Sequence, residues 1–165
     1  KRTEKVIRSF SEKETDDFIP GKIFLQDSTQ PWPDEVNNLD AIITSPPFFD
    51  STRFYSANWI RLWFSGWEAT DFATMPSKYV DEIQKKDMHI YNAIFSQAKE
   101  RLKEDGVLVF HLGKSKKCDM GAILMELANK FFKGKELFSE SVAHCNKFGI
   151  KDLGTVTDHQ YLILW

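Results

Sequence analysis

Apolar residues along this chain occur in short runs of strand length and in longer stripes with a helical period. Runs that predict strands lie at about 22–26, 40–44 and 107–112. Between the last two, apolar residues at three- and four-residue steps predict a long helix over 76–102, with Pro76 in the first turn. Because helix, glycine and a continuous apolar strand follow one another here, we expect the crossover unit of an α/β sheet, with a parallel strand covered on both faces.

The remaining patterns extend this α/β arrangement. Residues 52–67 predict a helix or an ordered loop with many aromatic side chains, which would either fill the core or cover a site. A second amphipathic helix is expected over 119–132, and two strands over about 136–145 and 156–165 close the chain. Residues 1–20 are charged and end in a Pro-Gly turn signal, so we interpret them as a linker or a short helix before the domain.

Composition indicates that the 165 residues form a single folded domain. Hydrophobic residues make up 42% and aromatic residues 14% of the chain, which argues against disorder over most of it. No apolar stretch has the length of a membrane-spanning helix, and the charged N-terminus does not resemble a signal peptide. Cys118 and Cys145 lie in unrelated contexts, and the histidines show no ligand spacing. We therefore expect a reduced, cytoplasmic protein with no metal site and no membrane partner.

The strand expected over 40–44 leads directly into a rigid turn, Ser45-Pro46-Pro47-Phe48. An exocyclic amine on cytosine or adenine is a poor nucleophile because its lone pair is delocalised into the ring. The Ser45 hydroxyl and the Pro46 carbonyl can each accept one amine hydrogen and free that lone pair, while both prolines remove competing N–H donors. Phe48 offers an apolar face for a base taken out of a duplex. The turn therefore predicts chemistry on an amino nitrogen.

This turn resembles the Asp/Asn/Ser-Pro-Pro-Tyr/Phe signature of DNA amino-methyltransferases, which use S-adenosylmethionine to methylate cytosine N4 or adenine N6. The serine form is more often associated with cytosine N4, so cytosine is favoured here. The preceding segment, Gly21–Ser28, is similar to the short strand ending in Gly-Asp-Ser that precedes the turn in this family, with Gln26 in place of the glycine. The resemblance covers about residues 21–165, which we expect to form the catalytic part of the domain.

The resemblance implies a Rossmann-like methyltransferase sheet, mostly parallel with a terminal antiparallel hairpin and with helices on both faces. It also implies a site-specific DNA methyltransferase that flips its target base and transfers the methyl group without a covalent enzyme intermediate. The residues that it assigns to catalysis are Ser45, Pro46, Pro47 and Phe48. The residues that it places at the cofactor S-adenosylmethionine are Asp27, Ser28 and Thr44.

Further residues are candidates for contact with the substrate. Phe49, Arg53 and Tyr55 follow the turn closely and would shape the base pocket or touch the displaced strand. Lys114 follows an expected strand at its carboxyl end, where open α/β sheets place ligands, although a lysine there also suits a solvated loop. His159 precedes the last strand, where it would either contact the flipped base or act as a hydrogen-bonding residue of the connection.

One part of the family's pattern is missing from this chain. The cofactor site of these enzymes depends on a Gly-rich loop after the first strand, whereas the eight glycines here are scattered. The formal net charge of −2 likewise does not indicate a complete DNA-binding unit, because affinity for a duplex comes largely from neutralised phosphates. The chain is therefore an incomplete or permuted domain, or it receives the loop from a second chain, or it is a degenerate homologue.

Two other functions fit the same residues. A methyltransferase that acts on an amino group of RNA or of a protein glutamine uses a related turn that usually begins with Asn, so the serine at position 45 argues against it. A non-catalytic or partner-dependent subunit that binds nucleic acid would keep the turn and lack the cofactor loop. Whether this chain alone binds S-adenosylmethionine separates such a subunit from a self-sufficient enzyme.

Overall fold

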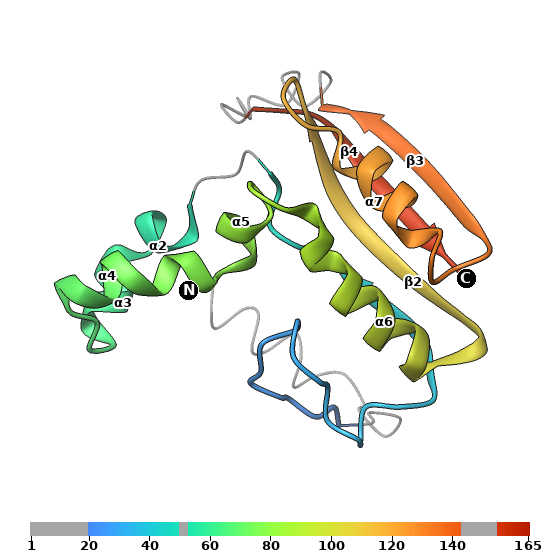
Figure 1. The fold of residues 1–165 in the computed structure, drawn as a ribbon, viewed down its shortest axis with the longest axis horizontal. Coiled ribbons are helices and arrows are strands. Elements are labelled where there is room, and N and C mark those ends of the chain that lie inside the picture. The colour runs from blue at the N-terminus through green and yellow to red at the C-terminus, as the bar shows by residue number, and fades with distance from the viewer. Residues whose placement is uncertain (1–19, 50–52, 143–154) are drawn as a thin grey trace, which may run out of the picture.

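The computed structural model of this chain describes residues 20–49, 53–142 and 155–165. Its centre is a four-stranded sheet with the strand order β1-β2-β4-β3 (Figure 1). The strands are β1 (Leu39–Thr44), β2 (Leu102–Ser115), β3 (Lys135–Ser141) and β4 (Val156–Leu164). Only β1 and β2 are parallel, because β4 inserts between β2 and β3 and runs antiparallel to both. The fold is therefore α/β with a mixed sheet, and the expectation of a mostly parallel sheet is wrong.

Alternation along β2 determines which side of the sheet forms the core. Leu108, Phe110 and Leu112 are fully buried, while the residues between them are half-buried. Helices α6 (Tyr91–Arg101) and α7 (Met120–Ala128) pack against the buried side and lie in front of the sheet in Figure 1. The helices contribute apolar residues at helical spacing: Tyr91, Ile94, Phe95, Ala98, Met120, Leu124 and Ala128. The helix expected over 119–132 is therefore confirmed over Met120–Ala128.

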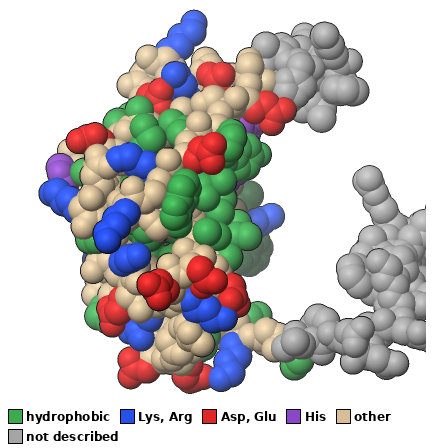
Figure 2. All heavy atoms as spheres, turned by 90° about the vertical axis from the view of Figure 1, so that its right-hand side faces the viewer, with side chains coloured by type: hydrophobic (Ala, Val, Ile, Leu, Met, Phe, Trp, Pro, Cys, Tyr) green, Lys and Arg blue, Asp and Glu red, His purple; other side chains and the backbone are tan. Residues whose placement is uncertain are grey.

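No helix of the described residues packs on the opposite face of the sheet. Its apolar side chains include Ile43, Phe138 and Tyr161, which keep 79%, 49% and 38% of their surface exposed. Figure 2 shows hydrophobic side chains gathered on one side of the molecule. Since α6 and α7 both pack on the other face, the expected cover of helices on both faces is not found in the described part of the chain.

The single helix expected over 76–102 is wrong, because extended residues divide this region. Tyr79 has ψ 144°, and Asp87 has φ −150° and ψ 108°, which are not helical values. The Asp87 carboxylate instead accepts a hydrogen bond from the His89 N–H and caps a new turn. The region therefore consists of η1 (Met75–Lys78), α5 (Val80–Ile83), η2 (Met88–Ile90) and α6. Among the described residues, no helix has the length and apolar character to cross a membrane.

The described part of the aromatic segment over 52–67 forms two short helices, α2 (Phe54–Ala57) and α3 (Trp59–Phe64), which α4 (Ala69–Thr74) follows in the chain. These helices lie beside the sheet rather than on it (Figure 1). Trp63 and Phe64 on α3 are 59% and 80% exposed, so packing of the whole aromatic stripe into the core is wrong. Trp67 is half-buried, and its ring contacts Phe72 with the centroids 5.1 Å apart.

The strand expected over 22–26 is absent from the described structure, because this segment has no neighbouring strand to pair with. Ile23 and Leu25 are fully exposed as a result. The next residues turn tightly, since the Asp27 carboxylate accepts hydrogen bonds from the N–H and the hydroxyl of Thr29. Residues 1–19, which we interpret as a linker or short helix, and the end of the strand expected over 136–145 lie outside the described residues.

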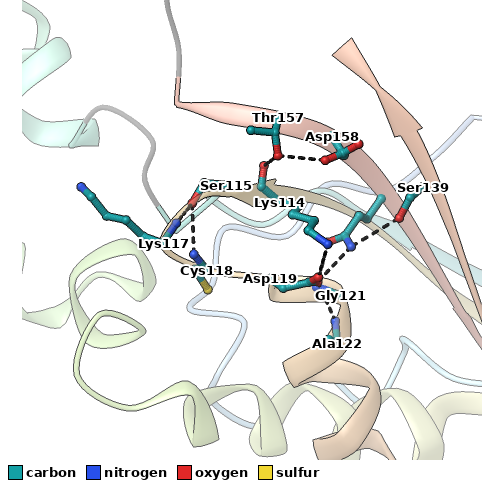
Figure 3. Close-up of polar contacts among 11 residues, drawn as sticks. Lys114, Ser115, Lys117, Cys118, Asp119, Gly121, Ala122, Ser139, Thr157 and Asp158 are labelled. Atoms are coloured by element: carbon teal, nitrogen blue, oxygen red, sulfur yellow. Dashed lines mark hydrogen bonds and ion pairs between the residues drawn. The ribbon is translucent and has the colours of Figure 1, made fainter. Parts of the chain in front are cut away.

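A polar network joins the start of α7 to the sheet (Figure 3). The Asp119 carboxylate accepts hydrogen bonds from the Ala122 N–H at 3.0 Å and from the Gln160 amide at 2.9 Å, and it pairs with Lys114 at 2.7 Å. The Gln160 carbonyl in turn accepts from the Gly121 N–H at 3.0 Å. Burial acts to raise the pKa of Asp119, but the donors, Lys114 first among them, lower this pKa overall. The Asp119 carboxyl is therefore charged, and in this form it holds the start of α7 against the sheet.

We expect Asp119→Ala to lower the free energy of unfolding by about 1–2 kcal/mol, because it removes the N-cap of α7 and leaves polar partners unsatisfied. Urea denaturation measures this loss, and Glu126→Ala, which removes an exposed carboxylate from the same helix, should change stability by less than about 0.5 kcal/mol. Because the pKa of Asp119 is lowered in the folded state, its contribution is present above an ordinary carboxyl pKa and is lost in acid. A loss that is equal for the two variants would contradict this role.

Candidate functional site

The turn that follows β1 is held in place by a hydrogen bond from a buried side-chain amide. The Gln84 side chain, which is 1% exposed, donates a hydrogen bond to the Pro47 carbonyl at 3.0 Å. The Tyr91 hydroxyl donates to the Gln84 side-chain carbonyl at 2.8 Å, so both ends of this amide are satisfied. Two prolines already restrict the backbone of the turn, and this network fixes its position over α6.

Phe48, the last residue of the turn, lies on β2 at the point where that strand has a glycine. A Cβ atom added to Gly113 would lie 2.5 Å from the Phe48 ring, so only glycine admits the ring at this position. The same ring meets the rings of His111 and His159 edge to face, with centroid distances of 5.3 and 5.9 Å. The backbone N–H of Phe49 contacts the Met120 sulfur at 3.2 Å, which ties the end of the turn to α7.

Ser45, the first residue of the turn, lies on the bare face of the sheet beside a pair of histidines. Its hydroxyl oxygen is 3.1 Å from His111 Nδ1, and His111 Nε2 is 2.8 Å from His159 Nδ1. The His111 ring also stacks on Tyr161, with the centroids 5.1 Å apart and the planes 21° from parallel. Ser45, His111 and His159 therefore form a continuous chain of hydrogen bonds that runs across β1, β2 and β4.

His111 is a candidate site residue that sequence reasoning missed. It lies within the apolar run over 107–112, which we interpreted as a strand buried on both faces, so its position gave no reason to expect a site. The available signal was its place on the opposite side of the strand from Phe110, which strand alternation alone supplies. Burial, and next the neighbouring His159, lower the pKa of His111 below its ordinary value. The imidazole is therefore neutral at physiological pH and can accept a proton.

The turn contains two candidate acceptor oxygens, the Ser45 hydroxyl and the Pro46 carbonyl. The Ser45 hydroxyl carries one hydrogen, and when this hydrogen points at His111 both lone pairs of the oxygen remain available. Ser45 is exposed, and within residues 20–49, 53–142 and 155–165 no donor occupies the Pro46 carbonyl. These two groups are the acceptors that an amino group with two hydrogens needs.

The predicted cofactor residues lie on the other side of the turn, where they border two hollows. Ser28, Thr44 and Pro46 line a hollow of about 320 Å³ over α6. Asp27 and Ser28 line a larger hollow of about 680 Å³, whose wall also includes Pro47 and the α5 region. The fold therefore brings these three residues, which are distant from α5 in sequence, next to the Ser45–Phe48 turn. A volume of several hundred cubic ångströms is typical of sites for small molecules and cofactors.

The remaining substrate candidates fall into separate environments. His159 lies near the turn, where its Nδ1 atom contacts the His111 ring that in turn contacts Ser45. Arg53 donates to the Tyr55 hydroxyl at 3.1 Å and pairs with Glu82 at 3.1 Å, so both candidates face α5. The Lys114 ammonium group is held by Asp119 at the start of α7 rather than at the turn. In the part of the chain that the structure describes, no cluster of acidic, histidine and cysteine side chains could hold a metal ion.

No protein-family model, curated protein or solved structure matches this chain. The function is therefore inferred from the geometry around Ser45.

Replacing Gln84 with Met should loosen the turn, because it leaves the Pro47 carbonyl and the Tyr91 hydroxyl without their buried partner. We expect a loss of about 2–3 kcal/mol in the free energy of unfolding. Tyr91→Phe removes only the hydroxyl and should have a smaller effect in the parent and almost none in the Gln84→Met background. Denaturation of the two single variants and the double variant measures this coupling, and strictly additive losses would show that the three groups do not act together.

Proposed function

We propose that this chain forms the base-binding and catalytic part of a methyltransferase that transfers a methyl group from S-adenosylmethionine to the exocyclic amine of a flipped DNA base, with cytosine N4 favoured. The observation that carries this proposal is the succession, at the end of β1, of an exposed Ser45 and a Pro46 carbonyl that accepts no hydrogen bond from the described residues. Both accept hydrogen bonds, and the adjacent prolines offer no N–H that would compete for a base acceptor.

The chain's own groups act on the amine before transfer. As Ser45 and Pro46 each accept one amine hydrogen, the nitrogen moves toward tetrahedral geometry and its lone pair becomes available. Phe48 is half-buried and fixed by Gly113, so it can hold the base plane without moving. S-adenosylmethionine, when bound, supplies an electrophilic methyl group. The catalytic effect of this site is therefore chiefly one of positioning and of acceptors directed at the charge that develops on nitrogen.

The residues present fit part of the cofactor. The larger hollow, bordered by Asp27 and Ser28, has the volume for a nucleoside. The smaller hollow is bordered by Thr44 and Pro46, which lie at the proposed catalytic turn. A cluster of glycine N–H groups for the rest of the molecule is not present in the sequence. Asp27, Ser28 and Thr44 would accordingly hold one portion of S-adenosylmethionine, and the remaining contacts would come from elsewhere.

A second candidate function, a subunit that depends on a partner, is favoured by the exposure of β1. In the described part of the chain, β1 pairs only with β2, so its other edge has free backbone groups. Ile43 on this strand is 79% exposed, and the apolar face beside it is bare. A second chain or a further segment that adds a strand to this edge would pair with these backbone groups and could bring the missing Gly-rich loop to Thr44.

Transfer of a labelled methyl group from S-adenosylmethionine to DNA, RNA and protein tests the proposal. We expect labelling of DNA, with N4-methylcytosine as the product identified by mass spectrometry. Ser45→Ala should lower kcat by about 100-fold with little change in KM, because the lost acceptor acts mainly in the transition state. Phe48→Ala should weaken base binding as well. Ser56→Ala, at an exposed position on α2, is the matched control and should keep full activity.

The partner-dependent alternative gives a different result. Calorimetry on the chain alone would then detect no binding of S-adenosylmethionine, and activity would appear only after a partner is added. Activity that is equal in the parent, Ser45→Ala and Phe48→Ala would refute the role of the turn in either case.

A further inference from the structure

We propose that His111 and His159 form a proton-accepting relay behind Ser45, which sets the Ser45 hydroxyl as an acceptor and takes the proton that the methylated amine must release. This inference rests on the proposed function, because the proton comes from the amine. The geometry consists of two successive contacts, from Ser45 Oγ to His111 Nδ1 at 3.1 Å and from His111 Nε2 to His159 Nδ1 at 2.8 Å.

The hydrogen atoms in this chain can be ordered in only two ways when both imidazoles are neutral. In the outward order, Ser45 donates to His111 Nδ1, and His111 Nε2–H donates to His159 Nδ1. In the inward order, His159 Nδ1–H donates to His111 Nε2, and His111 Nδ1–H donates to Ser45. A neutral imidazole carries a single N–H, so the tautomer of His111 fixes the order of the whole chain.

The order of the chain determines what Ser45 offers to a substrate. In the outward order the hydroxyl hydrogen is used internally, and Ser45 and the Pro46 carbonyl both act as acceptors for an NH₂ group. In the inward order the hydroxyl hydrogen is free to point outward as a donor, which suits a carbonyl oxygen instead. An amine substrate therefore requires the outward order, in which His111 and His159 carry their hydrogens on Nε2.

The outward order also gives the leaving proton a path. Formation of the bond between nitrogen and the methyl carbon leaves a positively charged amine with one hydrogen in excess. This proton passes to Ser45 Oγ as the original hydroxyl hydrogen moves to His111 Nδ1. The Nε2 proton of His111 then moves to His159 Nδ1, and the Nε2 proton of His159 passes to water. The amine and Ser45 end neutral, and both histidines end as neutral Nδ1–H tautomers, which return to the Nε2–H form by proton exchange with water or by ring flips before the next transfer.

The surroundings of His111 keep its imidazole neutral, so that Nδ1 can accept a proton. Burial and His159 lower the pKa of His111, so it is neutral above its depressed pKa and is protonated only in more acidic solution. Tyr161 stacks on one face of His111, and Phe48 closes the edge of both imidazoles. Glu140 is the register partner of His159 on β3.

Nitrogen-15 NMR of the histidine side chains in this chain tests the relay without any methyl transfer. At neutral pH we expect both His111 and His159 to be the Nε2–H tautomer, and we expect the pKa of His111 to lie below about 6.5, the ordinary value. Ser45→Ala should shift the His111 Nδ1 resonance and leave the tautomer unchanged. His159→Gln should raise the pKa of His111, because it removes a neighbour that lowers this pKa.

His89→Gln is the matched control, because this histidine is exposed and bonds to Asp87 rather than to the relay. It should leave the His111 resonances and pKa unchanged. An Nδ1–H tautomer at His111, or a His111 pKa that does not respond to His159→Gln, would overturn the relay. These results are independent of the methyl-transfer assay, so the expected tautomers without DNA methylation would refute the proposed function and leave the hydrogen-bond order standing.

Discussion

The structure around the turn depends on one buried amide, that of Gln84. A polar side chain that is removed from water must satisfy its donors and acceptors, and here its partners are the Pro47 carbonyl and the Tyr91 hydroxyl. This requirement ties α5, α6 and the turn into one unit. The Pro47 carbonyl is thus used internally, whereas no backbone N–H of the described residues donates a hydrogen bond to the Pro46 carbonyl.

The candidate site lies at the boundary between the covered and the bare face of the sheet. Even-numbered residues of β2 such as Phe110 fill the core under α6 and α7, whereas His111 projects to the bare face and meets Ser45. The smaller of the two hollows, on the helical side, borders Thr44, one residue before Ser45. A single strand end therefore presents one residue to each side, which places a proposed base-binding residue and a proposed cofactor-binding residue next to each other in the chain.

Local pattern was sufficient for the parts of the fold that local energetics determine. The apolar runs predicted β1 and the centre of β2, and the stripe that begins at Met120 predicted α7. Pattern failed where distant contacts decide the structure. The apolar run over 22–26 has no strand to pair with, and the stripe over 76–102 is divided because Gln84 must reach Pro47 and Asp87 caps a new turn. His111 and His159, 48 positions apart, meet only through the antiparallel β2–β4 register, which no local pattern contains.

The central claim is that this corner of the backbone recognises an NH₂ group through two fixed acceptors. The most direct measurement compares binding of a single-stranded oligonucleotide that carries one cytosine with binding of the same strand carrying 2-pyrimidinone, which lacks the exocyclic amine. We expect the cytosine strand to bind about tenfold more tightly than the 2-pyrimidinone strand, because the latter loses one or two hydrogen bonds. Equal affinity of this chain for the two strands would contradict it.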